Sequence, residues 1–306
     1  MITKDDLFSR INQGVVDERL EAFWRNVKKN RPLIKKFGGL RKILPRFNLK
    51  NVIIIGAGPS LEANIDLLKK YQKCSDIVLV AADMSLRILM RNGIIPSFVF
   101  SCETTPVDFF SGFDTSGMHL AAFSCMSHSN LMKWSGDVSF YNWMLDDHAY
   151  GDLWDYAGRD LGFLATASII TTQAVAFSLG ASVSTIMMVG NDLGFTDRFY
   201  ARGSVASVNR MPGTGRLTTL ESAGMDNVRK RREYHINRGG SIFCTNNQFL
   251  AAKMWLEEVI SSSGVPVYDC SVPGCSEKYV RKSTLKEYMS IVQKMKTGDY
   301  GYDSIA

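Results

Sequence analysis

The chain has 306 residues and a mass of 34.2 kDa, which suits one large domain or two modest ones with a buried core. Hydrophobic residues make up 45% and charged residues 22%, a composition that excludes a disordered or collagen-like chain. We expect no membrane-spanning helix, because no apolar run approaches the roughly 18 residues required, and no signal peptide, because the N-terminus is charged. The six cysteines lack the paired spacing of a zinc site, so we expect reduced thiols in the cytoplasm.

The net charge of +6 is unevenly distributed. Residues 25–50 hold ten basic residues and no acidic one, so the rest of the chain has a net charge of −4. Such a basic segment can attract nucleic acid, an anionic membrane or an acidic partner, or it can be the solvated face of helices. No aromatic or glycine pattern of a nucleic-acid-binding module accompanies it, so we do not expect nucleic-acid binding.

Apolar residues at helical spacing predict helices in the first 48 residues, divided into two by Pro32, Gly38 and Pro45. From residue 51 onward, short β-branched runs alternate with helical stretches. We expect strands at 51–55, 77–82, 97–101, 120–123, 138–141, 185–190 and 265–268, and helices at 61–71, 85–92, 166–179 and 247–261. This alternation predicts an α/β fold around a mostly parallel sheet.

A glycine-rich turn follows the first buried run. The motif GAGPSL places Gly56, Gly58, Pro59 and Ser60 between a strand and a helix. Glycines allow a ligand to approach the backbone closely, and the free N–H groups of a helix N-terminus bind phosphate. Leu61 stands where the NAD fingerprint has its third glycine, and no Gly-Lys-Ser/Thr follows as in a P-loop. The motif predicts a nucleotide-phosphate loop, with an ordinary strand-to-helix turn as the alternative.

Two carboxylates follow the second and third runs. Asp83 stands where such folds place a carboxylate against a ribose hydroxyl, and it equally suits the cap of the helix that contains Ser85. Glu103 follows the third run at the same edge of the sheet, where it could bind a metal or a sugar hydroxyl or simply be exposed. We expect Asp83, Ser85 and Glu103 to bind the nucleotide.

Further polar residues flank the helix predicted at 166–179. Thr166, Ala167 and Ser168 stand at its start, where hydroxyl groups either cap a helix or donate to a phosphate. Asn191 and Asp192 follow the next strand, which indicates either site residues or a turn. We expect the three residues at 166–168 and Asn191 to contact the nucleotide.

Residues 198–238 lack apolar periodicity and are rich in Gly, Arg, Ser and Asn, which is typical of an active-site flap or of a partly disordered segment. His235 follows the basic run at 229–232, which is either a solvated surface or a group that neutralises a diphosphate or a sugar carboxylate. We divide the chain into a basic helical extension at 1–48, a nucleotide-binding catalytic domain at 49–282 that includes this flap, and a C-terminal helix and tail at 283–306.

These motifs, in this order, resemble the DUF115 group. The resemblance rests on GAGPSL, on AADMSLRILMRNGIIPSFVFSCE and on TTQAVAFSLGASVSTIMMVGNDLGF, and it covers roughly residues 51–280. The group includes archaeal 6-hydroxymethylpterin diphosphokinases of the MptE type and bacterial motility-associated factors thought to glycosylate flagellin. Glu103 stands where the group usually has Asp. The resemblance implies a Rossmann-like domain.

A more distant resemblance is to Rossmann-like bacterial sialyltransferases that use CMP-sugars. In those enzymes a GxGPSL loop, a Thr-Ser-Gly tripeptide at a helix start, a Gly-Ile/Asn-Asp strand end and a later histidine recur in the same order. The corresponding positions in this sequence are residues 56–61, 166–168 and 190–193 and His235. Ala167 departs from the tripeptide.

The resemblances imply a transferase. The leading hypothesis is a glycosyltransferase that moves a nonulosonic-acid-type sugar (sialic, pseudaminic or legionaminic-like) from a CMP donor to a protein or glycan acceptor, with His235 as the general base and Asp192 as a second catalytic residue. CMP leaves with one phosphate, so no cofactor is obligatory. The alternatives are a diphosphokinase that uses ATP and Mg²⁺ held by Glu103 and Asp192, and a non-catalytic nucleotide-binding module.

The basic segment favours the glycosyltransferase, because a kinase of small molecules needs no protein-docking segment. We expect residues 25–50 to be dispensable for nucleotide binding and to be needed for a macromolecular acceptor. The expected ligand is a nucleotide or a nucleotide-sugar. A homo-oligomer is compatible with the sequence.

Overall fold

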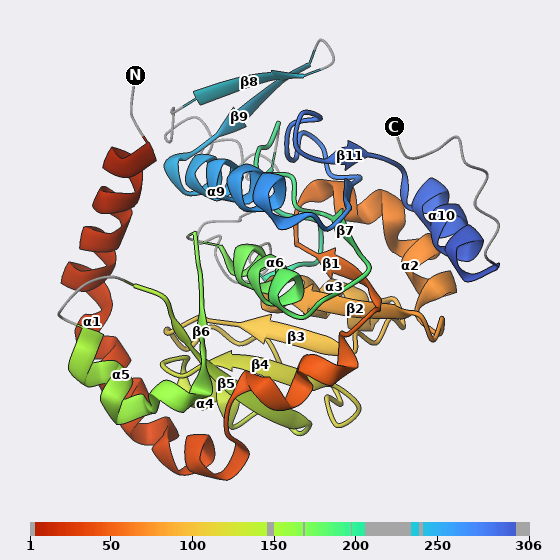
Figure 1. The fold of residues 1–306 in the computed structure, drawn as a ribbon. Coiled ribbons are helices and arrows are strands. Elements are labelled where there is room, and N and C mark those ends of the chain that lie inside the picture. The colour runs from red at the N-terminus through yellow and green to blue at the C-terminus, as the bar shows by residue number, and fades with distance from the viewer. Residues whose placement is uncertain are drawn as a thin grey trace, which may run out of the picture.

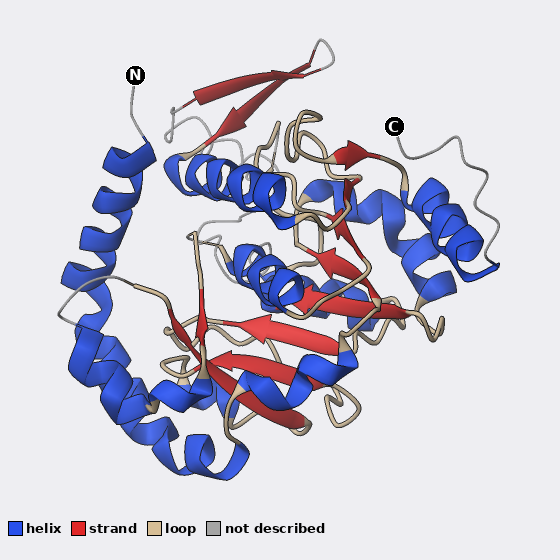
Figure 2. Ribbon diagram, viewed as in Figure 1, coloured by secondary structure: helices blue, strands red, loops and turns tan. Residues whose placement is uncertain are grey.

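The computed structural model describes residues 4–145, 150–167, 169–196, 198–205, 234–238 and 241–297, with the backbone alone for residues 4–18, 234–238 and 241. Its centre is a nine-stranded sheet with the order β11-β10-β7-β1-β2-β3-β4-β5-β6 (Figure 1). Neighbouring strands in this sheet are parallel throughout. Helices cover the sheet (Figure 2), and the predicted Rossmann-like α/β fold is confirmed.

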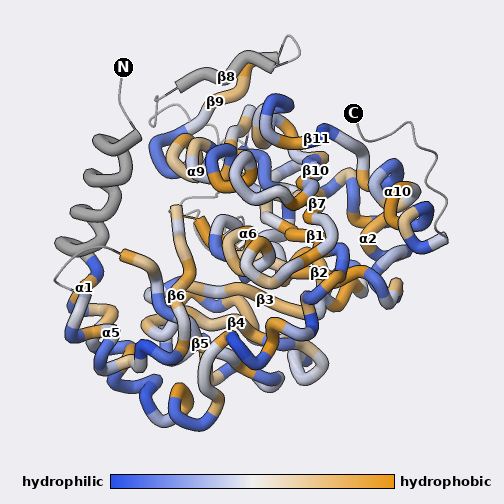
Figure 3. Tube along the Cα trace, viewed as in Figure 1, coloured by the Kyte–Doolittle hydropathy of each residue, from blue (hydrophilic) through white to orange (hydrophobic). Residues whose placement is uncertain are grey.

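The strands of the sheet are short, and all except the edge strands β6 and β11 are almost entirely buried. They are β1 (Asn51–Ile55), β2 (Ile77–Ala82), β3 (Phe98–Ser101), β4 (His119–Phe123), β5 (Asp137–Trp143), β6 (Phe163–Leu164), β7 (Thr185–Val189), β10 (Val267–Asp269) and β11 (Arg281–Lys282). All seven predicted strands form, with ends that differ by at most two residues. Figure 3 shows several of these apolar runs in orange. They are buried because helices lie over the sheet. The two-residue strands β6 and β11 are too short for a sequence pattern to reveal.

The helices between the strands also follow the predicted alternation. They are α2 (Ile65–Tyr71), α3 (Asp83–Arg91), α4 (His128–Leu131), α5 (Gly151–Ala157), α6 (Ile170–Gly180), α9 (Asn247–Ser263) and α10 (Leu285–Thr297), with 3₁₀ helices at η1 (Leu40–Arg46), η2 (Pro59–Asn64) and η4 (Arg159–Leu161). Among the residues described, no helix is both long and apolar enough to cross a lipid bilayer.

The first helix, α1 (Lys4–Phe37), is longer than predicted. It continues through Pro32, where a break was expected, and a turn at Gly38, with φ of +71°, follows it. Pro32 is exposed, so water can hydrate the carbonyl group that its missing N–H would have bonded. Figure 1 shows α1 along one edge of the sheet, beside α5 and β5.

The N-terminal segment contributes directly to the core. Phe23 is fully buried and its ring contacts the rings of Phe123 and Trp143, at centroid distances of 5.3 and 5.6 Å. Ile43 and Phe47 of the following segment are also buried. Residues 1–48 therefore supply part of the hydrophobic core beneath the sheet. The basic side chains that the structure describes as exposed in this segment are Arg19, Arg25, Lys28, Lys29, Lys35, Lys36, Arg41, Lys42 and Arg46.

The two described ends of the predicted flap at 198–238 have defined contacts. Arg198 forms an ion pair with Glu62 at 3.0 Å, and the Ala201 N–H donates to the Ala57 carbonyl at 2.8 Å. At the other end, β8 (Tyr234–Arg238) pairs with β9 (Ser241–Thr245) in an antiparallel hairpin. The sequence analysis did not predict this hairpin. Residues 206–233 lie outside the described part of the chain.

Candidate active site

A cavity of about 240 Å³ lies at the carboxyl edge of the sheet, close to the lower end, roughly 300 Å³, of the volumes typical of small-molecule sites. The chain runs outward from β1 through β2, β3, β4 and β5, then returns to β7 on the other side of β1. The crevice at such a reversal is where open α/β sheets bind ligands. The cavity is lined by six of the predicted site residues: Gly56, Gly58, Asp83, Glu103, Asn191 and Asp192.

The turns after β1 and β7 pack tightly against each other. The N–H groups of Gly56 and Gly58 donate to the carbonyl groups of Val189 and Gly190, each at 2.8 Å. A Cβ atom on Gly56 would collide with the Gly190 carbonyl oxygen, and Gly190 itself has a φ of +68°. The contact between the two turns thus requires glycine at Gly56 and Gly190, whatever ligand approaches them.

The Asp192 side chain, from the turn after β7, contacts the glycine-rich turn after β1 that the sequence predicts to bind phosphate. Its carboxylate accepts hydrogen bonds from the Ser60 N–H at 2.9 Å and from the Ser60 hydroxyl. A Cβ atom on Gly58 would lie 2.6 Å from Asp192 Oδ2. Burial raises the pKa of Asp192 to about 6, and the Ser60 hydrogen bonds oppose that rise. The Ser60 N–H that was expected to meet a phosphate therefore already has an anionic partner within the chain.

Asp83 lies at the end of β2 and is almost fully buried. Its Oδ1 accepts from the Met84 N–H and its Oδ2 from the Ser101 hydroxyl, each at 2.7 Å. Burial raises its pKa to about 7; the Ser101 hydrogen bond opposes the rise, and the negative charge of Glu103 adds to it. Glu103 itself accepts from the N–H and the hydroxyl of Thr105, at 3.0 and 2.7 Å. This side of the cavity therefore carries two carboxyl groups, those of Asp83 and Glu103.

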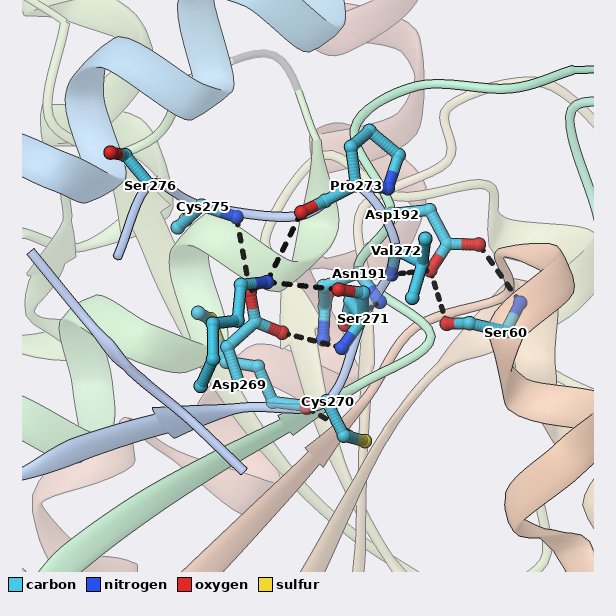
Figure 4. A network of polar contacts seen from close by, with 12 residues as sticks. Ser60, Asn191, Asp192, Asp269, Cys270, Ser271, Val272, Pro273, Cys275 and Ser276 are labelled. Atoms are coloured by element: carbon cyan, nitrogen blue, oxygen red, sulfur yellow. Dashed lines mark hydrogen bonds and ion pairs between the residues drawn. The ribbon is translucent and has the colours of Figure 1, made fainter. Parts of the chain in front are cut away.

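A polar network supports the opposite side of the cavity (Figure 4). The buried carboxylate of Asp269 accepts from the Lys282 ammonium at 2.7 Å and from the N–H groups of Ser271 and Cys275. The Ser271 hydroxyl accepts from the Asn191 N–H at 2.8 Å. The Asn191 amide donates to the Ile54 carbonyl at 3.0 Å. The network thus connects the strand ends of β1, β7 and β10. The sequence analysis missed Asp269 and Lys282, which are 13 residues apart and follow no motif.

Several predicted site residues are not among those that line the cavity. Pro59 is the first residue of η2. The Ser85 hydroxyl is buried and donates to the carbonyl groups of Ile55 and Ala82, at 3.1 and 2.8 Å. Thr166 accepts from the Gln173 amide at 3.0 Å, and Ala167 is buried. Ser168 lies outside the described residues.

The side chain of His235 is outside the described residues, but its backbone has a defined position. His235 pairs with Cys244 in the β8–β9 hairpin, and Cys244 exchanges two backbone hydrogen bonds with Phe195, each at 2.8 Å. Neighbouring strands are about 4.8 Å apart, so the backbone of His235 lies about 10 Å from Phe195. Phe195 follows Gly194, which lines the cavity.

The cavity also contains residues that the sequence analysis did not identify. Aromatic side chains line it from three segments: Phe109, Phe199, Tyr200 and Phe249. Arg19 of α1 lines it as well, and it is the single cationic side chain among the described lining residues. The sequence did contain a signal that could have identified Arg19. The spacing of Arg19, Phe23, Asn26 and Asn30 places polar side chains on the apolar face of one helix.

The two carboxylates considered for Mg²⁺ each have donors from the chain, Asp192 from Ser60 and Glu103 from Thr105. Within the described residues, no group of three or more His, Cys, Asp or Glu side chains is placed to hold a metal ion. Mg²⁺ is commonly bound by one or two carboxylates together with substrate phosphates. Asp192 and Glu103 therefore fit Mg²⁺ only as an ion that is bound together with the phosphates of a nucleotide.

The fold and the cavity define an α/β protein with a cavity at the topological switch point of its sheet. A family model described as 6-hydroxymethylpterin diphosphokinase MptE-like matches residues 21–198, and the chain belongs to this MptE-like family. A search of curated proteins gave no match.

Among solved structures, the chain is similar to the MAf glycosyltransferase from Magnetospirillum magneticum AMB-1, with a TM-score of 0.52 and 17% sequence identity. The similarity covers 82% of this chain and 37% of that one, so the chain spans little more than a third of its structural neighbour.

Proposed function

We propose that the protein is a glycosyltransferase that transfers a nonulosonic-acid-type sugar from a CMP-sugar to a protein or glycan acceptor in the cytoplasm. The observation that carries this proposal is the cavity at the switch point, which combines tight glycine turns, buried polar groups and an aromatic wall. Aromatic side chains stack on a planar base, and carboxyl and amide groups bind sugar hydroxyls. Membership of the MptE-like family supports a transferase, and the fold shared with a MAf glycosyltransferase supports the glycosyltransferase class.

The proposed transfer is a substitution at the anomeric carbon of the sugar. The acceptor hydroxyl oxygen forms a bond to that carbon while the bond to the phosphate oxygen breaks, and CMP leaves with the electron pair. A general base takes the hydroxyl proton. We assign the base to His235, because β8 is joined through β9 to Phe195 beside the cavity, and because a histidine can accept a proton at neutral pH.

The remaining roles follow from position in the cavity. Asp83 and Asn191, at the ends of β2 and β7, would contact the base and the ribose, and the turn at Gly58 would approach the phosphate. Asp192 would act through Ser60, because its carboxylate orients that residue in the turn.

The test of the reaction class is release of nucleotide by the purified chain. We expect release of CMP from CMP-N-acetylneuraminic acid without added metal and in the presence of a chelator. The diphosphokinase alternative, which the family description favours, predicts release of AMP from ATP that depends on Mg²⁺. AMP release with no CMP release would overturn the proposal.

The role of His235 is tested separately. General-base catalysis typically contributes about 10²–10⁴-fold, so His235→Ala should lower turnover by that factor and leave the Kd for CMP unchanged. Asn237→Ala, on the same strand, is the matched control and should retain wild-type turnover. Wild-type turnover by His235→Ala would show that another group takes the proton.

A further inference from the structure

The N-terminal helix α1 is attached to the carboxyl edge of the sheet, the same edge that holds the cavity. The Asn26 amide donates to the carbonyl groups of Thr104 and Cys125, at 2.9 and 3.1 Å. The Asn30 amide donates to the carbonyl groups of Ser124 and Met126, at 3.0 and 2.9 Å. These segments follow β3 and β4, so four hydrogen bonds hold α1 over the ends of the two strands.

The position of α1 directs Arg19 to the cavity. Arg19, Phe23, Asn26 and Asn30 are spaced by four, three and four residues, so they lie on one face of the helix. Phe23 is fully buried against the sheet, and Arg19 is one turn further toward the N-terminus. Arg19 accordingly lines the cavity. Cys102 and Glu103, which follow β3, line the same cavity.

The charges in the cavity are unbalanced. Asp83, Glu103 and Asp192 line it, and the described donors to Asp83 and Asp192 are hydroxyl and backbone N–H groups of the chain. Among the residues whose side chains the structure describes, none forms an ion pair with Arg19. An anionic ligand is repelled by the three carboxyl groups and finds one cationic side chain among the described lining residues. A guanidinium group binds phosphate or carboxylate through two parallel hydrogen bonds.

We propose that Arg19 binds the anionic group of the ligand, a nucleotide phosphate or the carboxylate of the transferred sugar, so that α1 forms part of the binding site. This inference rests on the proposed function for the identity of the ligand. It gives α1 a role distinct from the docking of an acceptor by the basic segment at 25–50.

The experiment compares Arg19→Gln with Arg25→Gln, which removes the same charge from another exposed position on the same helix that is not among the residues lining the cavity. Binding of CMP, cytidine and a C3-fluorinated, slowly reacting CMP-N-acetylneuraminic acid is measured by titration calorimetry. Arg19→Gln should raise the Kd for the CMP-sugar analogue at least tenfold and leave the Kd for cytidine within twofold. Arg25→Gln should leave all three within twofold. An equal loss for CMP identifies the phosphate as the group bound, and a loss confined to the CMP-sugar identifies the carboxylate.

An unchanged Kd for CMP and for the CMP-sugar in Arg19→Gln would overturn the inference, as would an equal loss in Arg25→Gln. A parallel titration with ATP and adenosine separates this inference from the proposed function. If the wild-type chain binds ATP but not CMP or the CMP-sugar, a tenfold weaker binding of ATP by Arg19→Gln, with adenosine unchanged, supports the role of Arg19 while the proposed function fails. Absence of binding to every nucleotide would overturn both.

Discussion

Two corners of the carboxyl edge each contain a buried aspartate, and their surroundings differ. At the corner between β7 and β10, Asp269 is fully buried and accepts from the Lys282 ammonium and from two backbone N–H groups. At the corner between β2 and β3, Asp83 accepts from one hydroxyl and from backbone N–H groups, with its pKa raised to about 7 by burial. The first carboxyl has a cation from its own chain, and the second has none among the described residues.

The carboxyl group of Asp269 therefore has a structural role, whereas that of Asp83 is available to a ligand. Lys282 also donates to the carbonyl groups of Ser271 and Pro273, so it holds the whole loop after β10 in place. That loop supports Asn191 through Ser271, which positions one wall of the cavity. Asp83, by contrast, lines the cavity directly and faces the space where a ligand can supply a further partner. The corner at Asp269 supports the wall of the cavity, and the corner at Asp83 forms part of its lining.

The largest expected effect is at the first corner. Lys282→Met leaves the Asp269 carboxylate buried without its cation, and loss of one partner of a buried pair costs about 3–5 kcal/mol. We expect that decrease in the free energy of unfolding, measured by urea denaturation at pH 7. Lys278→Met, at an exposed position nearby, should change the free energy by less than about 0.5 kcal/mol. A decrease below about 1 kcal/mol for Lys282→Met would mean that the Asp269–Lys282 pair does not hold this corner.

The next effect concerns the pH dependence of stability at the second corner. The pKa of Asp83 is raised from 3.8 to about 7 in the folded chain. Its contribution to the free energy of unfolding is therefore fully present below about pH 4 and is lost as the pH rises through 7. A shift of roughly three units corresponds to about 4 kcal/mol. Asp83→Asn should remove most of this loss.

Unfolding free energies measured from pH 4 to pH 8 test that expectation. A smaller decline should remain in Asp83→Asn up to about pH 6, because the pKa of Asp192 is also raised. Identical pH profiles for the wild-type chain and Asp83→Asn would show that Asp83 is not the group that titrates.

The smallest effect tests the attachment of α1 to the second corner. Asn30→Ala removes the two hydrogen bonds to the carbonyl groups of Ser124 and Met126. Leaving buried carbonyl groups without donors costs about 2 kcal/mol, which thermal or urea denaturation can measure. Lys29→Ala, at the exposed neighbouring position, should have little effect. Equal stability of the two variants would indicate that apolar packing of α1 is sufficient.

Much of the fold could be predicted because its strands are continuous apolar runs. Ile53 and Val80, for example, lie in runs that only a sheet covered by helices can bury, and parallel strands joined by helices follow from their alternation. The strand ends at Gly56, Asp83 and Asn191 could also be placed at one edge, since the carboxyl ends of parallel strands meet there. The β8–β9 hairpin was missed because it follows a segment with no apolar period.

The sequence by itself determined the parallel sheet, the glycine turns and the group of polar residues at its carboxyl edge, since these depend on local pattern and chain order. The tertiary structure decided which donors each carboxyl group meets. The Asp192 carboxylate accepts from the N–H of Ser60, 132 residues away in the sequence, and the Asp269 carboxylate accepts from the ammonium group of Lys282. It also decided that α1 lies over the sheet edge and brings Arg19 to the cavity. Contacts between residues distant in sequence arise only when the whole chain packs, so no local pattern records them.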